Sequence, residues 1–157
     1  MIPSAPGDRP RRILAIASGG GHWVQLLRLR SAFAGHAVTY ATVARAYAAD
    51  VPGCRFRAIP DATQWNKLRL LWLAFRVLLL VLRERPDVIV STGAAPGYFA
   101  LRLGKLLRAR TVWLDSIANV ETLSLAGRLA GRYADLWLTQ WPHLARPAGP
   151  HFLGGTV

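Results

Sequence analysis

The segment from residue 13 to residue 25 constrains the fold most, and it reads Ile-Leu-Ala-Ile-Ala-Ser-Gly-Gly-Gly-His-Trp-Val-Gln. An apolar run typical of a buried β-strand ends in three glycines and passes directly into a helix-like segment. Glycine lets the backbone turn sharply and approach a ligand closely, and a helix N-terminus offers free N–H groups and a positive dipole end. Such a turn suits a phosphate, a carboxylate or a developing oxyanion, although a similar turn can serve only to pack a helix on a sheet.

Apolar runs and helix-like segments alternate along the rest of the chain. We expect strands over residues 12–18, 37–43, 55–59, 87–91, 110–114 and 136–139, and helices over residues 22–33, 67–85, 98–107 and 123–133. In the first of these helices, Val24, Leu26 and Leu27 are expected to face inward. Several strands are apolar throughout, which is typical of a parallel sheet covered on both faces. The sequence therefore predicts an α/β fold with a doubly wound, mostly parallel Rossmann-like sheet and ligands near the carboxyl ends of its strands.

The chain length is sufficient for one such unit. Its 157 residues can form one domain with a substantial core, which we place at residues 12–157. Residues 1–11 are expected to form a flexible basic leader, since they contain no apolar segment of the kind found in a signal peptide or a membrane span. There is no room for a second such domain, so chemistry that needs two facing domains would require another chain.

Composition narrows the class of partner. The single cysteine, Cys54, excludes an internal disulfide and fits a reducing compartment. The four histidines have no metal-ligand spacing, so we expect no metal site. The net charge of +12 indicates an anionic partner, either nucleic acid or a membrane surface. The 6 tryptophans favour the membrane, because this side chain prefers the boundary between water and lipid.

The predicted helix after residue 66 is apolar on nearly every side. Arg69, Arg76 and Arg83 fall within about 40° of one another around its axis and form one basic stripe. The segment is too short and too charged to cross a bilayer, which takes about 20 apolar residues. One side can cover the sheet, while the rest, with Trp65 and Trp72, is a candidate for the membrane interface, where arginines reach anionic headgroups. The alternative is a buried core helix whose arginines mark its solvent edge.

Five short motifs occur in a recognisable order. They are Ser-Gly-Gly-Gly-His at 18–22, Ser-Thr-Gly-Ala-Ala-Pro-Gly at 91–97, Trp-Leu-Asp-Ser-Ile-Ala-Asn-Val at 113–120, Thr-Leu-Ser-Leu-Ala-Gly at 122–127 and Gln-Trp-Pro at 140–142. Together they resemble the acceptor-side, membrane-associated subunit of split GT-B glycosyltransferases. That family includes the recruiting subunit for the second N-acetylglucosamine of lipid-linked oligosaccharides, and bacterial exopolysaccharide and capsule counterparts. The resemblance spans about residues 12–157.

The resemblance implies a function and a set of partners. The chain would be the amino-terminal half of a GT-B enzyme, active only together with a separate donor-binding subunit that holds a UDP-sugar. It would present a polyprenyl-diphosphate-linked glycan as acceptor, as a peripheral protein on the cytoplasmic face of the bacterial inner membrane. It would use no cofactor and bind no nucleic acid. Because residues 1–11 contain no transmembrane anchor, attachment would depend on the long helix.

Inverting sugar transfer needs a base for the acceptor hydroxyl and stabilisation of the leaving diphosphate. His22 is a candidate base, because imidazole changes protonation state near neutral pH, or else a residue that caps or positions the turn. Asp115, at the end of a predicted strand, is the other candidate base, or else a helix cap. The candidates for phosphate or acceptor binding are Ser18, Gly19, Gly20, Gly21, Thr92, Gly93, Asn66 and Glu121. The candidates for membrane contact are Trp65, Arg69, Trp72, Arg76 and Arg83.

Two other classes of protein compete with this interpretation. The first is a Rossmann protein that binds a nucleotide, but the turn is not Gly-x-Gly-x-x-Gly. In addition, the second strand is followed by Ala44 and Arg45 and not by an acidic residue for a ribose. The second is a nucleic-acid-binding module, but the basic residues are scattered over many elements and form no known binding motif.

Overall fold

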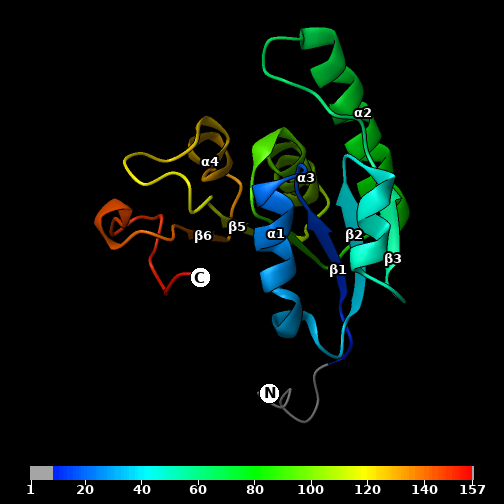
Figure 1. Cartoon of the computed structure of the whole chain (residues 1–157), viewed down its shortest axis with the longest axis horizontal. Coiled ribbons are helices and arrows are strands. Elements are labelled where there is room, and N and C mark those ends of the chain that lie inside the picture. The colour runs from blue at the N-terminus through cyan, green and yellow to red at the C-terminus, as the bar shows by residue number, and fades with distance from the viewer. Residues whose placement is uncertain (1–8, 157) are drawn as a thin grey trace.

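The computed structural model of the chain describes residues 9–156, and a six-stranded parallel sheet forms its centre (Figure 1). The strands are β1 (Arg12–Ile16), β2 (Ala37–Thr42), β3 (Arg55–Ala58), β4 (Val88–Ser91), β5 (Arg110–Leu114) and β6 (Leu136–Leu138). Their order in the sheet is β3-β2-β1-β4-β5-β6, and all neighbouring pairs run parallel. The predicted doubly wound fold is confirmed. Residues 1–8 of the predicted leader lie outside the described residues.

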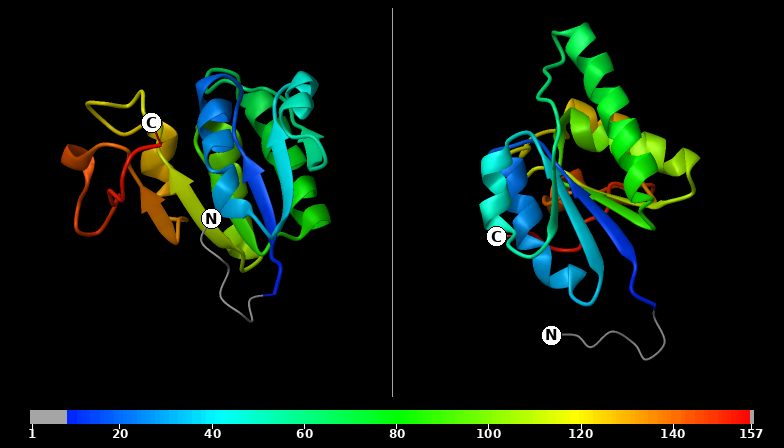
Figure 2. Two further views of the ribbon diagram at one scale, coloured as in Figure 1. Left: turned by 60° about the horizontal axis from the view of Figure 1, so that its bottom comes forward. Right: turned by 90° about the vertical axis from the view of Figure 1, so that its right-hand side faces the viewer.

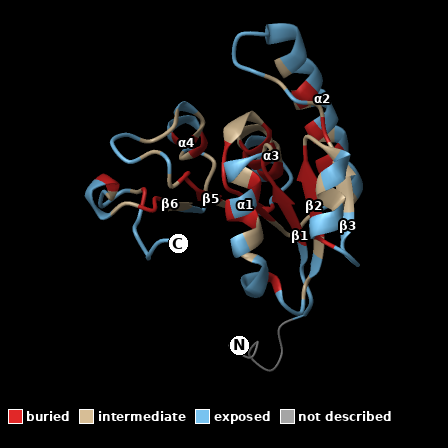
Figure 3. Cartoon of the chain, viewed as in Figure 1, coloured by how far each residue is buried: buried red, intermediate tan, exposed pale blue. Residues whose placement is uncertain are grey.

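Helices cover both faces of this sheet (Figure 2). They are α1 (Gly21–Arg28), α2 (Lys67–Glu84), α3 (Ala94–Leu106) and α4 (Leu125–Ala130), with 3-10 turns η1 (Arg30–Phe33), η2 (Arg45–Asp50) and η3 (Pro142–Leu144). On one face, Trp23 of α1 packs in a core with Tyr40 of β2. On the other face, the buried side of α2 packs in a second core with residues of α3 and α4. Burial is concentrated between these layers (Figure 3).

The first helix differs from the prediction. It is α-helical only from Gly21 to Arg28 and continues as η1. Val24, expected to face inward, is 50% exposed, whereas Trp23 and the polar Gln25 are buried. The physical reason is the size of the indole, which fills the core and donates from Nε1 to Asp50 Oδ2 at 2.8 Å. The prediction for Val24 was therefore wrong.

The third helix also begins earlier than predicted, at Ala94 inside the glycine-rich segment. A Cβ on Gly97 would lie 1.8 Å from Ser91 Oγ, so this helix can approach β4 only because residue 97 is glycine. Here glycine permits close packing of helix on strand, whereas the prediction assigned it to a turn.

The amino edge of the sheet is fastened by Asp87, which lies just before β4. The Arg12 backbone N–H donates to Asp87 Oδ2 at 2.8 Å, and Arg12 Nη2 donates to Oδ1 at 3.0 Å. The side-chain hydrogen bonds from Arg12 hold the pKa of Asp87 down at about 2. The carboxylate therefore stays ionised at neutral pH and joins the starts of β1 and β4.

At the carboxyl edge, the chain leaves β1 and β4 toward opposite faces. The segment after β1 forms α1, which covers one face, and the segment after β4 forms α3, which covers the other. Since β1 and β4 are neighbours in the sheet, the two helices begin on opposite faces at a topological switch point of the sheet. In open α/β sheets this switch point is where ligands bind.

Candidate functional site

The switch point joins His22 and Thr92 through two reciprocal hydrogen bonds. His22 Nδ1 lies 2.9 Å from the carbonyl oxygen of Thr92, and Thr92 Oγ1 donates to the carbonyl oxygen of His22 at 2.6 Å. Thr92 is fully buried and His22 is half-buried. The start of α1 and the end of β4 are thereby fixed to each other, although 70 residues separate them along the chain.

The first of these bonds determines how the imidazole is protonated when it is neutral. A carbonyl oxygen only accepts, so Nδ1 carries the hydrogen and Nε2 carries the lone pair. Nε2 of His22 makes no hydrogen bond to another residue within 9–156. The ring is therefore oriented by the backbone and keeps Nε2 as a proton acceptor at the switch point, which is the state a general base requires.

Gly93 leaves the space in which this ring lies. Its φ is 143°, and a Cβ at this position would lie 2.3 Å from His22 Nδ1. Its N–H donates to Ser91 Oγ at 3.2 Å. Thr92 and Gly93 were both predicted to bind an anion. In this structure they position the His22 ring, Thr92 by hydrogen bonds and Gly93 by having no Cβ.

The glycines before α1 leave an open surface at the helix N-terminus. A Cβ on Gly20 or Gly21 would meet nothing within 4 Å. The N–H of Gly20 donates to the Tyr47 hydroxyl at 3.0 Å, which attaches the turn to η2. The first helical hydrogen bond runs from Val24 N to Gly20 O at 3.1 Å. The preceding N–H groups, including that of His22, therefore have no partner within the helix.

Electrostatics at this turn favour an anion. The first turn of α1 contains no acidic side chain, so its dipole end is not neutralised locally. Ser18 is half-buried just after β1, and a Cβ on Gly19 would lie 3.2 Å from both Tyr47 and Val43. Of the predicted phosphate ligands, Ser18, Gly19, Gly20 and Gly21 thus lie together beside His22. The arrangement offers backbone donors for a phosphate next to a proton acceptor.

Asp115 lies at the end of β5 and is almost fully buried. Trp113 Nε1 and Ser124 Oγ donate to its Oδ1 at 3.2 and 2.6 Å, and Asn119 Nδ2 and Ser124 N donate to its Oδ2 at 3.1 and 3.0 Å. Ser124 also caps α4 by accepting from Gly127 N at 2.8 Å. The carboxylate therefore organises the loop from 115 to 124, and no hydrogen bond joins it to His22 within residues 9–156.

A buried polar relay connects this loop to α1, and our sequence analysis did not identify it. Gln25 Nε2 donates to Ser116 Oγ at 3.2 Å, and Gln140 Nε2 donates to Gln25 Oε1 at 3.0 Å. The Thr156 hydroxyl donates to Gln140 Oε1 at 2.7 Å. The Gln-Trp-Pro motif that begins at Gln140 was the one sequence signal for this relay. No sequence signal indicated a role for Gln25, nor for Tyr47, which accepts from Gly20 in the neighbouring turn.

The two remaining predicted ligands are not brought to the histidine. Asn66 caps α2, where its Oδ1 accepts from Arg69 N at 3.0 Å. Glu121 is exposed on the loop that Asp115 organises. Within residues 9–156, no group of three or more histidine, cysteine, aspartate or glutamate side chains is placed to hold a metal ion. None of the described helices combines the length and apolarity needed to cross a membrane.

Comparison with known proteins assigns the chain to a family. Residues 51–154 match the family model described as "Oligosaccharide biosynthesis protein Alg14 like". The UDP-N-acetylglucosamine transferase subunit ALG14 of Eremothecium gossypii is 30% identical over 169 residues, which cover 87% of this chain and 75% of that protein. The human protein of the same name is 34% identical over 91 residues, covering 53% of this chain and 40% of that protein.

Among solved structures, the MurG protein of Acinetobacter baumannii superposes with a TM-score of 0.73 at 12% sequence identity, over 93% of this chain and 46% of that one. The chain thus has the fold found in about half of a GT-B glycosyltransferase. The relatives described above are eukaryotic, so they lend no support to the expected bacterial inner membrane. The resemblance inferred from the five motifs is confirmed: the chain belongs to the Alg14-like family of oligosaccharide biosynthesis proteins.

Proposed function

We propose that this chain is the acceptor-binding, membrane-associating subunit of a two-chain glycosyltransferase that uses UDP-N-acetylglucosamine. The names of its relatives suggest the donor. The acceptor we propose is a glycan on a polyprenyl diphosphate. The chain matches about half the length of MurG, so the donor-binding half would belong to a separate subunit that docks over the carboxyl edge of the sheet.

The observation that carries this proposal is the oriented imidazole of His22 at the switch point, next to an uncapped helix N-terminus. In the proposed reaction the acceptor hydroxyl oxygen attacks the anomeric carbon of the UDP-sugar. Nε2 of His22 takes the hydroxyl proton, and the bond between the anomeric carbon and the diphosphate oxygen breaks, releasing UDP. The open turn at Gly20 and Gly21 would hold a diphosphate through the backbone N–H groups that follow Gly20, including that of His22, because the N–H of Gly20 itself is bound to Tyr47.

Asp115 has a positioning role in this proposal. Its four donors fill both oxygens, so its contribution is to hold the loop that carries Glu121. Glu121, exposed on that loop, is then placed to contact the acceptor glycan. Asn66, at the start of α2, would lie where the lipid diphosphate emerges from the membrane.

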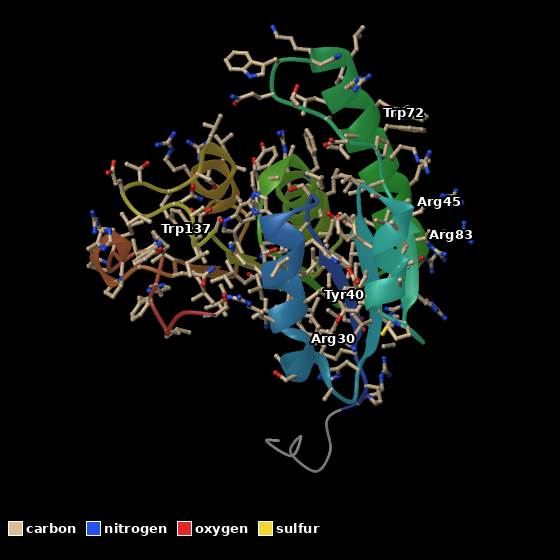
Figure 4. All side chains as sticks on the ribbon, viewed as in Figure 1. Arg30, Tyr40, Arg45, Trp72, Arg83 and Trp137 are labelled. Atoms are coloured by element: carbon tan, nitrogen blue, oxygen red, sulfur yellow. The ribbon has the colours of Figure 1, made fainter. Side chains whose placement is uncertain are left out.

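The proposed membrane contact is the outer face of α2. Leu73, Val77 and Val81 are buried against the sheet, while the opposite side carries large apolar side chains that are about half exposed or more: Leu68, Leu71, Trp72, Phe75, Leu79 and Leu82. Trp72 and Arg83 point outward from this face (Figure 4), and Arg76 lies 5.6 Å above the Trp72 ring. The first turns of α2 extend beyond the sheet (Figure 1), and Trp65 just before them is 85% exposed.

The whole proposal is tested by reconstitution. The purified chain alone is expected to transfer no sugar, because its 157 residues match only about half of a GT-B glycosyltransferase. Mixed with a donor-binding subunit, UDP-N-acetylglucosamine and a polyprenyl-diphosphate-linked acceptor, it should give transfer measured by radiolabel in the lipid product. Omitting each component in turn is the control. Turnover by the isolated chain would contradict a two-chain enzyme.

The membrane part predicts a specific loss of vesicle binding. Replacing Arg69, Arg76 and Arg83 with Gln should weaken binding to anionic vesicles by up to about 150-fold, since each basic residue near such a surface contributes about 1 kcal/mol. Binding to neutral vesicles should change less. Co-sedimentation at two salt concentrations measures both effects, and circular dichroism checks folding.

The matched control makes the same charge change away from α2, with Arg45→Gln, Arg128→Gln and Arg132→Gln. These three arginines are exposed and lie outside α2. Trp72→Ser should weaken binding to both kinds of vesicle, because it removes apolar contact. If the α2 triple variant binds anionic vesicles as well as the parent, α2 is not the anchor.

A further inference from the structure

At the amino edge of the sheet, opposite the His22 site, five arginines surround an open cavity of about 670 Å³. We call it the arginine cavity, and its charged lining consists of Arg11, Arg12, Arg85, Arg108, Arg110 and Asp87. Residues at or just after the ends of α2 and α3 line it, and β1 and β5 begin there. Nothing in the proposed transfer reaction uses this cavity.

The charges around the cavity are not balanced. Asp87 is its single acidic residue, and it is bound by Arg12. Among residues 9–156, the guanidinium groups of Arg85, Arg108 and Arg110 have no acidic partner. Like charges around one cavity repel one another, so an anion within it would relieve that repulsion.

The backbone at two of these arginines indicates that their side chains are needed. Arg85 has φ 44° and Arg108 has φ 61°, each in the left-handed conformation just after a helix. Glycine is favoured at this position, because a Cβ strains the backbone there. The helix dipoles do not explain the choice, since Arg83 and Lys105 already occupy the last turns. Two strained arginines that line one cavity suggest a ligand for both.

The rest of the lining is apolar and continuous with α2. Leu82 of the outer α2 face and Leu107 both line the cavity, and each is about half exposed. Leu106, which precedes Leu107, is 77% exposed. Guanidinium groups match a phosphate, and leucines beside them match acyl chains. A free phosphate would gain nothing from the leucines, so a phospholipid fits the cavity better.

We infer that the arginine cavity binds the headgroup phosphate of an anionic phospholipid, with Leu82, Leu106 and Leu107 against its acyl chains. This inference rests on the membrane contact proposed for α2. The two ends of α2 are about 27 Å apart. The exposed start of α2 would contact the membrane at one end, and the cavity would hold the amino edge of the sheet at the same membrane surface at the other end.

The test replaces the two strained arginines with the residue that their backbone prefers. Arg85→Gly with Arg108→Gly should leave the melting temperature unchanged or higher, since the left-handed strain is relieved. Binding to phosphatidylcholine vesicles containing phosphatidylglycerol should fall by about 30-fold, as expected for two basic residues at the surface. Binding to phosphatidylcholine alone should stay the same. The charge-matched control, Arg128→Gln with Arg132→Gln on the α4 side, should lose less than about 3-fold.

Three results would overturn the inference. The first is an equal loss in both double variants, which would mean that only the overall charge matters. The second is parental binding by the glycine variant. The third is calorimetric binding of inorganic phosphate that disappears in the glycine variant and is not displaced by vesicles containing phosphatidylglycerol, which would assign the cavity to free phosphate.

The same variants separate this inference from the proposed function. Sugar transfer to a detergent-solubilised acceptor should be unaffected in the glycine variant, because the cavity lies at the opposite edge from His22. If the parental two-chain complex transfers no sugar, the proposed reaction is wrong. The comparison of vesicle binding still tests whether the arginine cavity binds a phospholipid.

Discussion

His22→Ala is expected to lower the turnover of the two-chain complex by about 10²-fold or more, the range for loss of a general base. The physical reason is the oriented ring: Nδ1 is held by the Thr92 carbonyl at 2.9 Å, which leaves Nε2 as the proton acceptor. The fall should appear in kcat, with little change in the KM for the acceptor.

Added imidazole should restore part of the rate to His22→Ala, because it can occupy the vacated space. His36→Ala is the matched control, since His36 lines a different cavity at the amino edge of the sheet. Near-parental turnover of His22→Ala, together with an inactive Asp115→Asn, would move the role of base to Asp115.

Gly93→Ala is expected to cost about as much activity as loss of the histidine. The new Cβ would lie 2.3 Å from His22 Nδ1, so the ring must leave its position beside Thr92. The φ of 143° adds backbone strain for any residue with a Cβ, of the order of 1–3 kcal/mol. We expect a fall in turnover of about 10²-fold together with a lower melting temperature, and added imidazole should rescue little because the space is now filled.

Gly35→Ala separates strain from collision. Gly35 has φ 82°, but a Cβ there would meet nothing within 4 Å. This variant should lose stability without losing turnover. If Gly93→Ala reduces turnover no more than Gly35→Ala does, the contact between Gly93 and His22 has no role in catalysis.

The sheet was predictable because parallel strands buried on both faces leave continuous apolar runs in the sequence. The predicted bounds of β2, β3 and β5 differ from the observed ones by a residue or less. The ends of helices were less predictable. The helix after β1 stops at Arg28. Its buried side is set by Trp23, which donates to Asp50, and not by Val24, and that choice depends on tertiary contacts. The start of α3 at Ala94 depends on the fit of Gly97 against Ser91.

Of the candidate site, only the residues that are close together in the sequence could be predicted. The glycine turn and His22 are adjacent in sequence, so they could be recognised together. The partner of His22 could not, because Thr92 lies 70 residues away and reaches the ring only through the pairing of β1 with β4. Likewise, the sequence places Asp115 at a strand end, but the four donors that occupy it come from the way the following loop closes.

The group that orients the imidazole is a main-chain carbonyl, and this has a consequence for genetics. In many catalytic pairs the histidine donates a hydrogen bond to an acidic side chain, and mutation of that side chain lowers the activity and so identifies the pair. Here no codon change at position 92 can remove the carbonyl oxygen that accepts the hydrogen bond from His22, because every amino acid carries the same main-chain carbonyl. A saturation screen of this protein would therefore return an intolerant histidine with an intolerant glycine beside it and no acidic companion, the signature of a dyad whose second member belongs to the backbone.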